Sequence, residues 1–226
     1  MRILLFLLFF TAYSALSKPA QIDQLITLLP FEKSLKEEVN TEKVKPHEGV
    51  PLKELEIRES IWYLKDSETP YSGKVFRLYK NGQKDFEVNY KDGKREGLAT
   101  AWHENGLKKT EGNYKDGKKD GLEIWWHEDG QKRKEINYKD GKLDGPMNAW
   151  HENGQKAVEG KNKDGKTDGL YVSWHKNGQK QAEGNFKEGN ADGLFEAWHE
   201  NGQKMSERNC KDGKEISAKY WNSKGE

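Results

Sequence analysis

The chain is poor in residues that crosslink or interrupt a fold, with one cysteine and six prolines among 226 residues. Because Cys210 is the single cysteine, no internal disulfide can form. We interpret Cys210 as a small apolar residue near the C-terminal end of the fold, at a position that holds tyrosine or phenylalanine earlier in the chain. An intermolecular disulfide is the alternative.

The motifs of common enzymes are also missing. The sequence contains no Gly-x-Ser-x-Gly, no phosphate-binding loop and no His-Glu-x-x-His. The formal net charge is only +1, and lysine and arginine alternate with acidic residues, so no basic patch marks a nucleic-acid interface. The sequence therefore predicts no enzyme, no cofactor, no metal site and no nucleic-acid partner.

Long hydrophobic runs are rare, and the one that exists is at the start. Arg2 precedes an unbroken apolar run from Ile3 to Phe10, and small residues follow. This order is typical of a secretory signal peptide, which we place at residues 1–17 with cleavage before Lys18. Cleavage after Ser14 and retention as an uncleaved anchor are the alternatives. The signal predicts an exported protein, in the periplasm, on the outer surface or secreted.

What the sequence has in abundance is repetition. Words such as Ala-Trp-His-Glu-Asn-Gly recur, and their tryptophans follow one another at 24 residues. The repeat aromatics are Trp102, Trp126, Trp150, Trp174 and Trp198, with Tyr79 and Trp221 as outer members 23 residues away. Columns of histidine, Asn-Gly, glutamate and Asp-Gly keep the same step. About six copies of one unit are therefore predicted, since periods of 20–50 residues mark repeat architectures.

Each unit reads as a β-hairpin. Apolar residues alternate with polar ones before and after Trp126, which is a strand signal. We expect a tight turn with positive φ at Asp129-Gly130 and a longer connection over 139–145. Hydrophobic residues are only 33% of the chain, which suits a thin sheet better than a thick core. The predicted fold is all-β: an elongated antiparallel meander over 57–226, preceded by a partly helical tether at 18–56.

Side-chain alternation predicts two faces. The tryptophans should share a face with the leucines of the same strands, and we expect each indole to cover a glycine of the next strand, at Gly112, Gly160 and Gly184. The glutamate column should then lie on the opposite face. A strand is also expected over 55–64.

Three residues interrupt the predicted polar face and are our candidate partner contact: Trp125, Tyr171 and Phe195. The histidine column is interpreted as structural, because equivalent residues two strands apart are separated by about 9.5 Å and cannot share one metal ion. The tryptophan column is interpreted as core, with a ladder for sugar rings or quaternary ammonium groups as the alternative.

The unit resembles the MORN-type repeat in its bacterial variant form. The resemblance is carried by Trp102-His103-Glu104-Asn105-Gly106, by Glu111-Gly112-Asn113-Tyr114-Lys115-Asp116-Gly117 and by Asp120-Gly121. Proteins similar to this are commonly described as YwqK-type antitoxins. The resemblance implies a scaffold that binds a protein partner, with self-association, membrane attachment or an antitoxin role as narrower forms. The other class of function is a cell-surface glycan or lipid-headgroup binder.

Overall fold

The computed structural model describes residues 48–226. The predicted signal peptide and the partly helical tether as far as residue 47 lie outside the described residues. Within residues 48–226 no helix is long and apolar enough to cross a bilayer.

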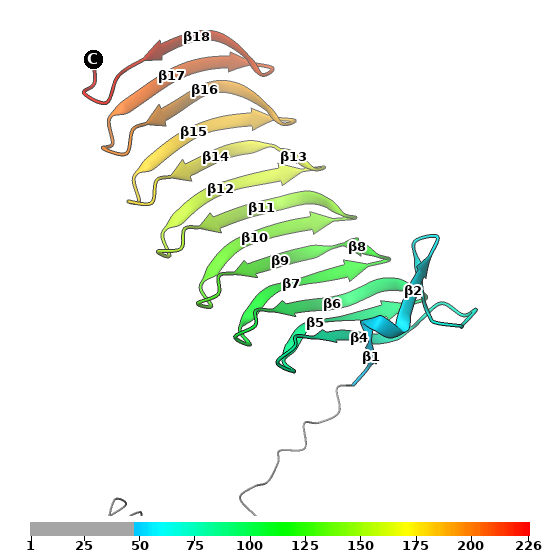
Figure 1. Cartoon of the computed structure of the whole chain (residues 1–226). Helices are drawn as coiled ribbons and strands as arrows, with labels where there is room; N and C mark the ends of the chain where they lie inside the picture. Colours follow the sequence, from blue (N-terminus) through cyan, green and yellow to red (C-terminus); the bar gives the residue numbers. More distant parts are fainter. Residues whose placement is uncertain (1–47) are drawn as a thin grey trace, which may run out of the picture. The chain divides into compact units, whose positions relative to one another are not determined.

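The described part is dominated by one sheet whose strands follow each other in chain order (Figure 1). Its strands are β1 (Val50–Pro51), β4 (Gly73–Leu78), β5 (Lys84–Lys91), β6 (Lys94–Trp102), β7 (Lys108–Lys115), β8 (Lys118–Lys119), β9 (Gly121–Trp126), β10 (Lys132–Lys139), β11 (Lys142–Trp150), β12 (Lys156–Lys163), β13 (Lys166–Thr167), β14 (Gly169–Trp174), β15 (Lys180–Lys187), β16 (Asn190–Trp198), β17 (Lys204–Lys211) and β18 (Lys214–Tyr220). All the pairings except β1 with β4 are antiparallel. The all-β antiparallel meander of tandem hairpins is therefore confirmed.

Each unit has a tight turn and a longer loop, and their positions are the reverse of those expected from the sequence. The two-residue turn lies at the Asp-Gly column, where Asp116 and Gly117 both have positive φ, 50° and 81°. Lys115 and Lys118 pair directly across it. This is the geometry that suits the twist of a tight hairpin. The expectation of a longer connection there was wrong.

The Asn-Gly column instead forms a five-residue loop. His103 N donates to Leu107 O at 2.9 Å, and the side chain of Asn105 accepts a hydrogen bond from Leu107 N at 3.0 Å. This bond from an asparagine side chain to the backbone two residues later replaces a backbone turn. Only Gly106, with φ of 83°, takes the left-handed conformation, so the predicted primed turn at this column was wrong.

The register of the hairpins also corrects the predicted faces. Ala99 pairs with Gly112 and Ala101 with Thr110, while Trp102 pairs with Lys108 after a bulge. The glycines therefore share a face with the residues one and three positions before each tryptophan. The glutamate column lies with the tryptophans: Lys108 Nζ pairs with Glu111 and stacks on Trp126. We call these the glycine face and the tryptophan face.

The indoles consequently do not cover the glycines, which was the expected packing. A Cβ added to Gly160 would lie 3.2 Å from Tyr171 Cδ2, and one added to Gly184 would clash with the ring of Phe195. Glycine is needed there because a ring on the glycine face of the following strand leans over it. The physical reason for the error is the bulge, which decouples the alternation of one strand from that of the next.

A small cap precedes the repeats at the N-terminal end of the sheet. Residues 55–64, expected as one strand, form a separate hairpin of β2 (Leu55–Arg58) and β3 (Ile61–Leu64), preceded by the 3₁₀ helix η2 (Leu52–Glu54). Strand β1 lies in the segment expected to be a tether. It pairs in parallel with β4, so ordered structure begins before residue 57.

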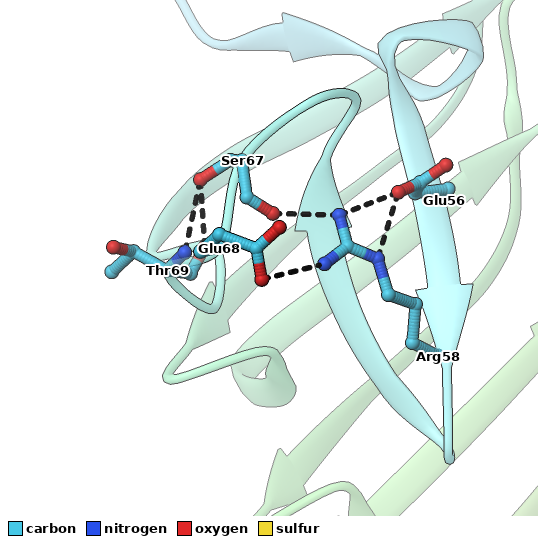
Figure 2. Close-up of polar contacts among 5 residues, drawn as sticks. All are labelled: Glu56, Arg58, Ser67, Glu68 and Thr69. Carbon is cyan, nitrogen blue, oxygen red and sulfur yellow. Dashed lines mark hydrogen bonds and ion pairs between the residues drawn. The ribbon is translucent and has the colours of Figure 1, made fainter.

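One arginine fastens this cap (Figure 2). Arg58 Nε donates to Glu56 Oε1 at 2.8 Å, and Arg58 Nη2 donates to Ser67 O at 2.6 Å. Glu68 lies 3.6 Å from the same guanidinium group. These bonds tie strand β2 to the turn that leads into the repeats.

The main hydrophobic core lies beneath the cap on the glycine face. Its buried residues are Leu55, Tyr71, Val75, Val88 and Tyr90. Farther along the sheet the burial is thinner, and leucines of the tryptophan face stay 41–50% exposed: Leu98, Leu122, Leu170 and Leu194. Each repeat therefore depends mainly on its neighbours, as in other linear arrays.

Candidate functional site

A lysine covers most of the repeat tryptophans. The ammonium groups lie 5.5–6.0 Å from the ring centres, which is cation–π geometry. The pairs are Lys84 with Trp102, Lys108 with Trp126, Lys156 with Trp174, Lys180 with Trp198 and Lys204 with Trp221. The indoles are half-buried. This arrangement makes the tryptophan column part of the packing between repeats.

Tyr79 differs from its expected place in that column. Its hydroxyl donates to Trp102 O at 2.7 Å, and its backbone N donates to Gln83 O as the histidines do to the corresponding loop residues. Tyr79 therefore occupies the histidine position of the first loop, and Leu78 stands where later units have tryptophan.

The histidines form a second ladder along the loops. His151 Nε2 lies 2.8 Å from Trp174 O, and His103, His175 and His199 make the equivalent bond to the next repeat. A carbonyl can only accept, so Nε2 must carry the proton. These rings serve the contact between loops, and within residues 48–226 no group of histidine, cysteine or acidic residues is arranged for a metal.

The asparagines form a third ladder. Asn153 Nδ2 donates to Lys176 O at 2.7 Å, and the other asparagines of the column donate in the same way to the next loop: Asn81, Asn105, Asn177 and Asn201. Each loop is therefore held to its neighbour by a side chain that also shapes its own turn.

All three ladders are interrupted at one step, between the loop after Trp126 and the loop after Trp150. His127 Nε2 is buried without a hydrogen-bond partner among the described residues. Asp129 replaces asparagine and has no N–H to donate. No lysine of the described part stacks on Trp150 as others do on its equivalents. The array thus has a local discontinuity at its middle.

A groove of about 490 Å³ lies at this discontinuity. Its apolar lining residues are Met147, Ala149, Val158 and Tyr171, and Trp150 also borders it. Arg133, Lys134, Lys176, Glu152 and the rings of His127 and His151 complete it. A hollow of this size with apolar walls and a few polar groups is typical of a binding site.

Several groove residues depart from the repeat. Lys134 occupies a column that holds Thr110, Val158, Ala182 and Ser206 in other units. Lys176 occupies a column that holds glutamate at 104, 128, 152 and 200 and lysine at 80. The fold does not require either cation, because equivalent strands and loops form without them.

Of the predicted contact residues, Trp125 lies beside the groove and not in it. Its neighbours across the sheet are Thr110 and Lys134. Lys119 Nζ lies 5.9 Å from the Trp125 ring, 4.8 Å from the Tyr138 ring and 2.6 Å from the buried carboxylate of Glu123. Burial lowers the pKa of Lys119, but the hydrogen bond to Glu123 and the charge of the same carboxylate, with smaller contributions from Tyr138 and Tyr114, together raise it above its ordinary value. Within this cluster, Trp125 pairs across the sheet with Lys134, which lines the groove.

Tyr171 and Phe195 lie together, on the other side. Both pack edge-on against Phe186, with ring centres 5.8 and 6.0 Å apart. Tyr171 also lines the groove, whereas Phe195 is covered by the Arg208 guanidinium group at 4.9 Å. Trp125 is four strands from Tyr171 along the sheet, roughly 19 Å. The three residues share the glycine face but do not form one patch.

Sequence reasoning missed the groove itself. Lys134 and Lys176 were visible as departures from their columns, but nothing in the sequence showed that the two line one groove.

Comparison with known families agrees with the fold. Four segments match the MORN repeat variant family. They are residues 95–116, 119–140, 167–188 and 191–212. The interval between the second and third matched segments carries Met147, Trp150 and Val158 of the groove. MORN repeats are commonly scaffolds that bind proteins or membranes, and the family is not known as enzymatic. No curated protein matches the chain.

Proposed function

We propose that this chain is a scaffold that binds a protein partner, and that the partner contacts the groove between the units of Trp126 and Trp150. The observation that carries the proposal is the coincidence of three broken ladders with a hollow of about 490 Å³. Elsewhere the loops are closed by their own hydrogen bonds. Here the buried Nε2 of His127 lacks a partner, and a ligand can bond to it without displacing a hydrogen bond of the protein.

Site-specific photo-crosslinking tests the proposal. Glu152 and Glu200 occupy the same repeat position and are both exposed, but only Glu152 lines the groove. Benzoylphenylalanine at position 152 should crosslink a discrete protein in extracts of the source cells, and the same group at position 200 should not. Equal products from the two positions, or none from position 152, would contradict the proposal.

An antitoxin or immunity role is the narrower form of this proposal, in which the partner is a toxin held inactive by the scaffold. It is supported by the resemblance of the repeats alone. The test is deletion of the gene. The role requires a growth defect that disappears when a neighbouring toxin gene is also deleted, and a deletion without a defect refutes it.

We also propose that the chain is exported, on the basis of the apolar run from Ile3 to Phe10. Cell fractionation and N-terminal sequencing test this. The expected product lies outside the cytoplasm and begins at Lys18. A cytoplasmic product that still begins at Met1 would contradict export.

The glycan or headgroup alternative rests on the regular tryptophan column. The geometry weighs against it, because a lysine already occupies the ring face that a quaternary ammonium group would need, except at Trp150. Tryptophan fluorescence measured with cell-wall glycans and with liposomes distinguishes ligand binding along the tryptophan column from binding at the groove. A shift that survives replacement of Trp150 by phenylalanine would favour the ladder over the groove.

A further inference from the structure

We propose that the groove recognises an acidic peptide segment that presents one apolar side chain between carboxylates. This inference rests on the proposed protein-binding function and names the chemistry of the partner. It is carried by the charge of the groove, by its apolar floor and by the absence of internal counterions.

The charge of the groove is unlike that of the rest of the surface. Arg133, Lys134 and Lys176 line it against one carboxylate, Glu152. None of the three cations forms an ion pair among residues 48–226, whereas the lysines of the cation–π ladder are paired with glutamates three residues later. The chain as a whole has a net charge of only +1, so the excess of two positive charges is a local feature of the groove and does not reflect a basic protein.

Lys134 is the most informative of these cations. It is half-buried in the middle of a strand, paired across the sheet with Trp125 on one side and Ala149 on the other. A long side chain in this position lays its methylenes along the apolar neighbours and holds its ammonium group at the rim. A carboxylate from a ligand would find there a cation that is partly desolvated and unpaired, where charge-assisted bonds are stronger than at an open surface.

The floor of the groove is apolar. Met147 and Val158 lie on the glycine face, and Tyr171 packs against Gly160 beside them. A thioether adapts to irregular ligand shapes, and Ala149 beside it leaves room for a ligand side chain. The pocket suits one aliphatic or aromatic side chain flanked by negative charges.

This combination favours a peptide over other anions. A nucleic acid would require a basic stripe along the sheet, and the lysines and carboxylates elsewhere are balanced. Inorganic phosphate would leave the floor made by Met147 and Val158 without a partner. Both serve as competing probes in the test.

Binding is measured on the full chain with a fluorescein-labelled pentapeptide, one leucine flanked on each side by two glutamates. Fluorescence anisotropy should show saturable binding that weakens as salt is raised, because the contacts are charged. Peptides with lysines in place of the glutamates, or serine in place of leucine, should bind at least about tenfold more weakly. Equal binding of these control peptides would overturn the proposal. So would displacement of the labelled peptide by inorganic phosphate or by a single-stranded oligonucleotide at lower concentration than by the unlabelled peptide.

The repeat supplies variants that should keep the fold. Lys134→Val installs the residue of the next unit, and Lys176→Glu restores the residue of its own column. Each should weaken binding of the acidic peptide by about tenfold, and the pair by more. Lys109→Ala is the matched control: Lys109 is the counterpart of Arg133 one unit earlier, outside the groove, so this change should leave binding within twofold. Binding unaffected by Lys134→Val would overturn the inference.

The same variants separate this inference from the proposed function. If the crosslink at position 152 persists in Lys134→Val, the groove binds a protein without using acidic recognition, and only the present inference fails. If no crosslink forms even in the parent chain, the proposed function itself fails.

Discussion

The interrupted loop ladder makes a quantitative prediction about stability at residue 129. Asp129 already makes the bond that shapes its own loop, with Oδ1 accepting from Gln131 N at 2.9 Å, as Asn153 Oδ1 does from Gln155 N at 3.1 Å. What it lacks is the second bond, the one that Asn153 donates to the following loop. Asp129→Asn therefore adds a donor and removes one negative charge, while the acceptor oxygen that shapes the loop is kept.

The expected magnitude follows from the worth of one such bond. An intramolecular hydrogen bond contributes about 0.5–1.5 kcal/mol net, and these loops are exposed, so we expect about 0.5–1 kcal/mol of added stability. For a domain of this size that corresponds to a rise in Tm of about 1–4 °C. The reverse change, Asn153→Asp, removes a bond of 2.7 Å and sets a carboxylate against a carbonyl, so it should cost about 1 kcal/mol or slightly more.

Thermal unfolding followed by circular dichroism measures both variants, with Asn153→Ala as a control that also loses the turn-forming bond. The ladder explanation is refuted if Asn153→Asp leaves Tm unchanged. If Asn153→Asp lowers Tm while Asp129→Asn does not raise it, the two central loops are too far apart to bond, and the discontinuity is a property of the backbone and not of residue 129.

Three further predictions concern the glycine face. Gly184→Ala should lower the free energy of unfolding by about 1–3 kcal/mol, because its Cβ would collide with the Phe195 ring. Gly112→Ala should cost less, about 1 kcal/mol or below, because the new Cβ would lie 3.1 Å from Cγ and 3.3 Å from Cβ of Glu123, a contact that small shifts relieve; urea titration compares the two variants. Burial raises the pKa of Tyr138 above its ordinary value of 10.0, so the stability that the neutral phenol contributes is complete below pH 10 and falls as pH rises through the folded pKa. Tyr138→Phe should therefore reduce the loss of unfolding free energy between about pH 9 and 11, measured by urea unfolding. The same dependence of unfolding free energy on pH in both proteins would contradict this. Cys210 is a buried free thiol, so a thiol reagent should modify it slowly in the native protein and rapidly in urea, and equal rates would show that it is accessible.

The repeat and its hairpins could be predicted because they depend on local signals. The alternation around Trp126 and the turn residues at a fixed step are sufficient for an antiparallel meander. The identity of the turns was less accessible, since Asn-Gly and Asp-Gly both tolerate primed turns. The five-residue loop is shaped by its own side chain, since Asn105 Oδ1 accepts from Leu107 N and Asp129 Oδ1 accepts from Gln131 N in the same way.

The face that carries the candidate contact residues was predicted, but their distance apart was not. Trp125, Tyr171 and Phe195 were placed correctly on one face, opposite the tryptophan column, because alternation along a single strand is reliable. Their separation along the sheet was not visible, since it depends on how many strands lie between them. For the same reason the convergence of Lys134 and Lys176 on one groove could not be read from spacing along the chain.

The sequence by itself determined the number of repeats, the antiparallel order and the interpretation of the histidines as loop residues. These follow from periodicity, which is preserved whatever the packing. The tertiary structure alone decided which columns share a face, because a bulge in each hairpin shifts the register between neighbouring strands. It also decided where the regular array opens into a groove, because three absent ladder contacts become one site only when consecutive loops are stacked in space.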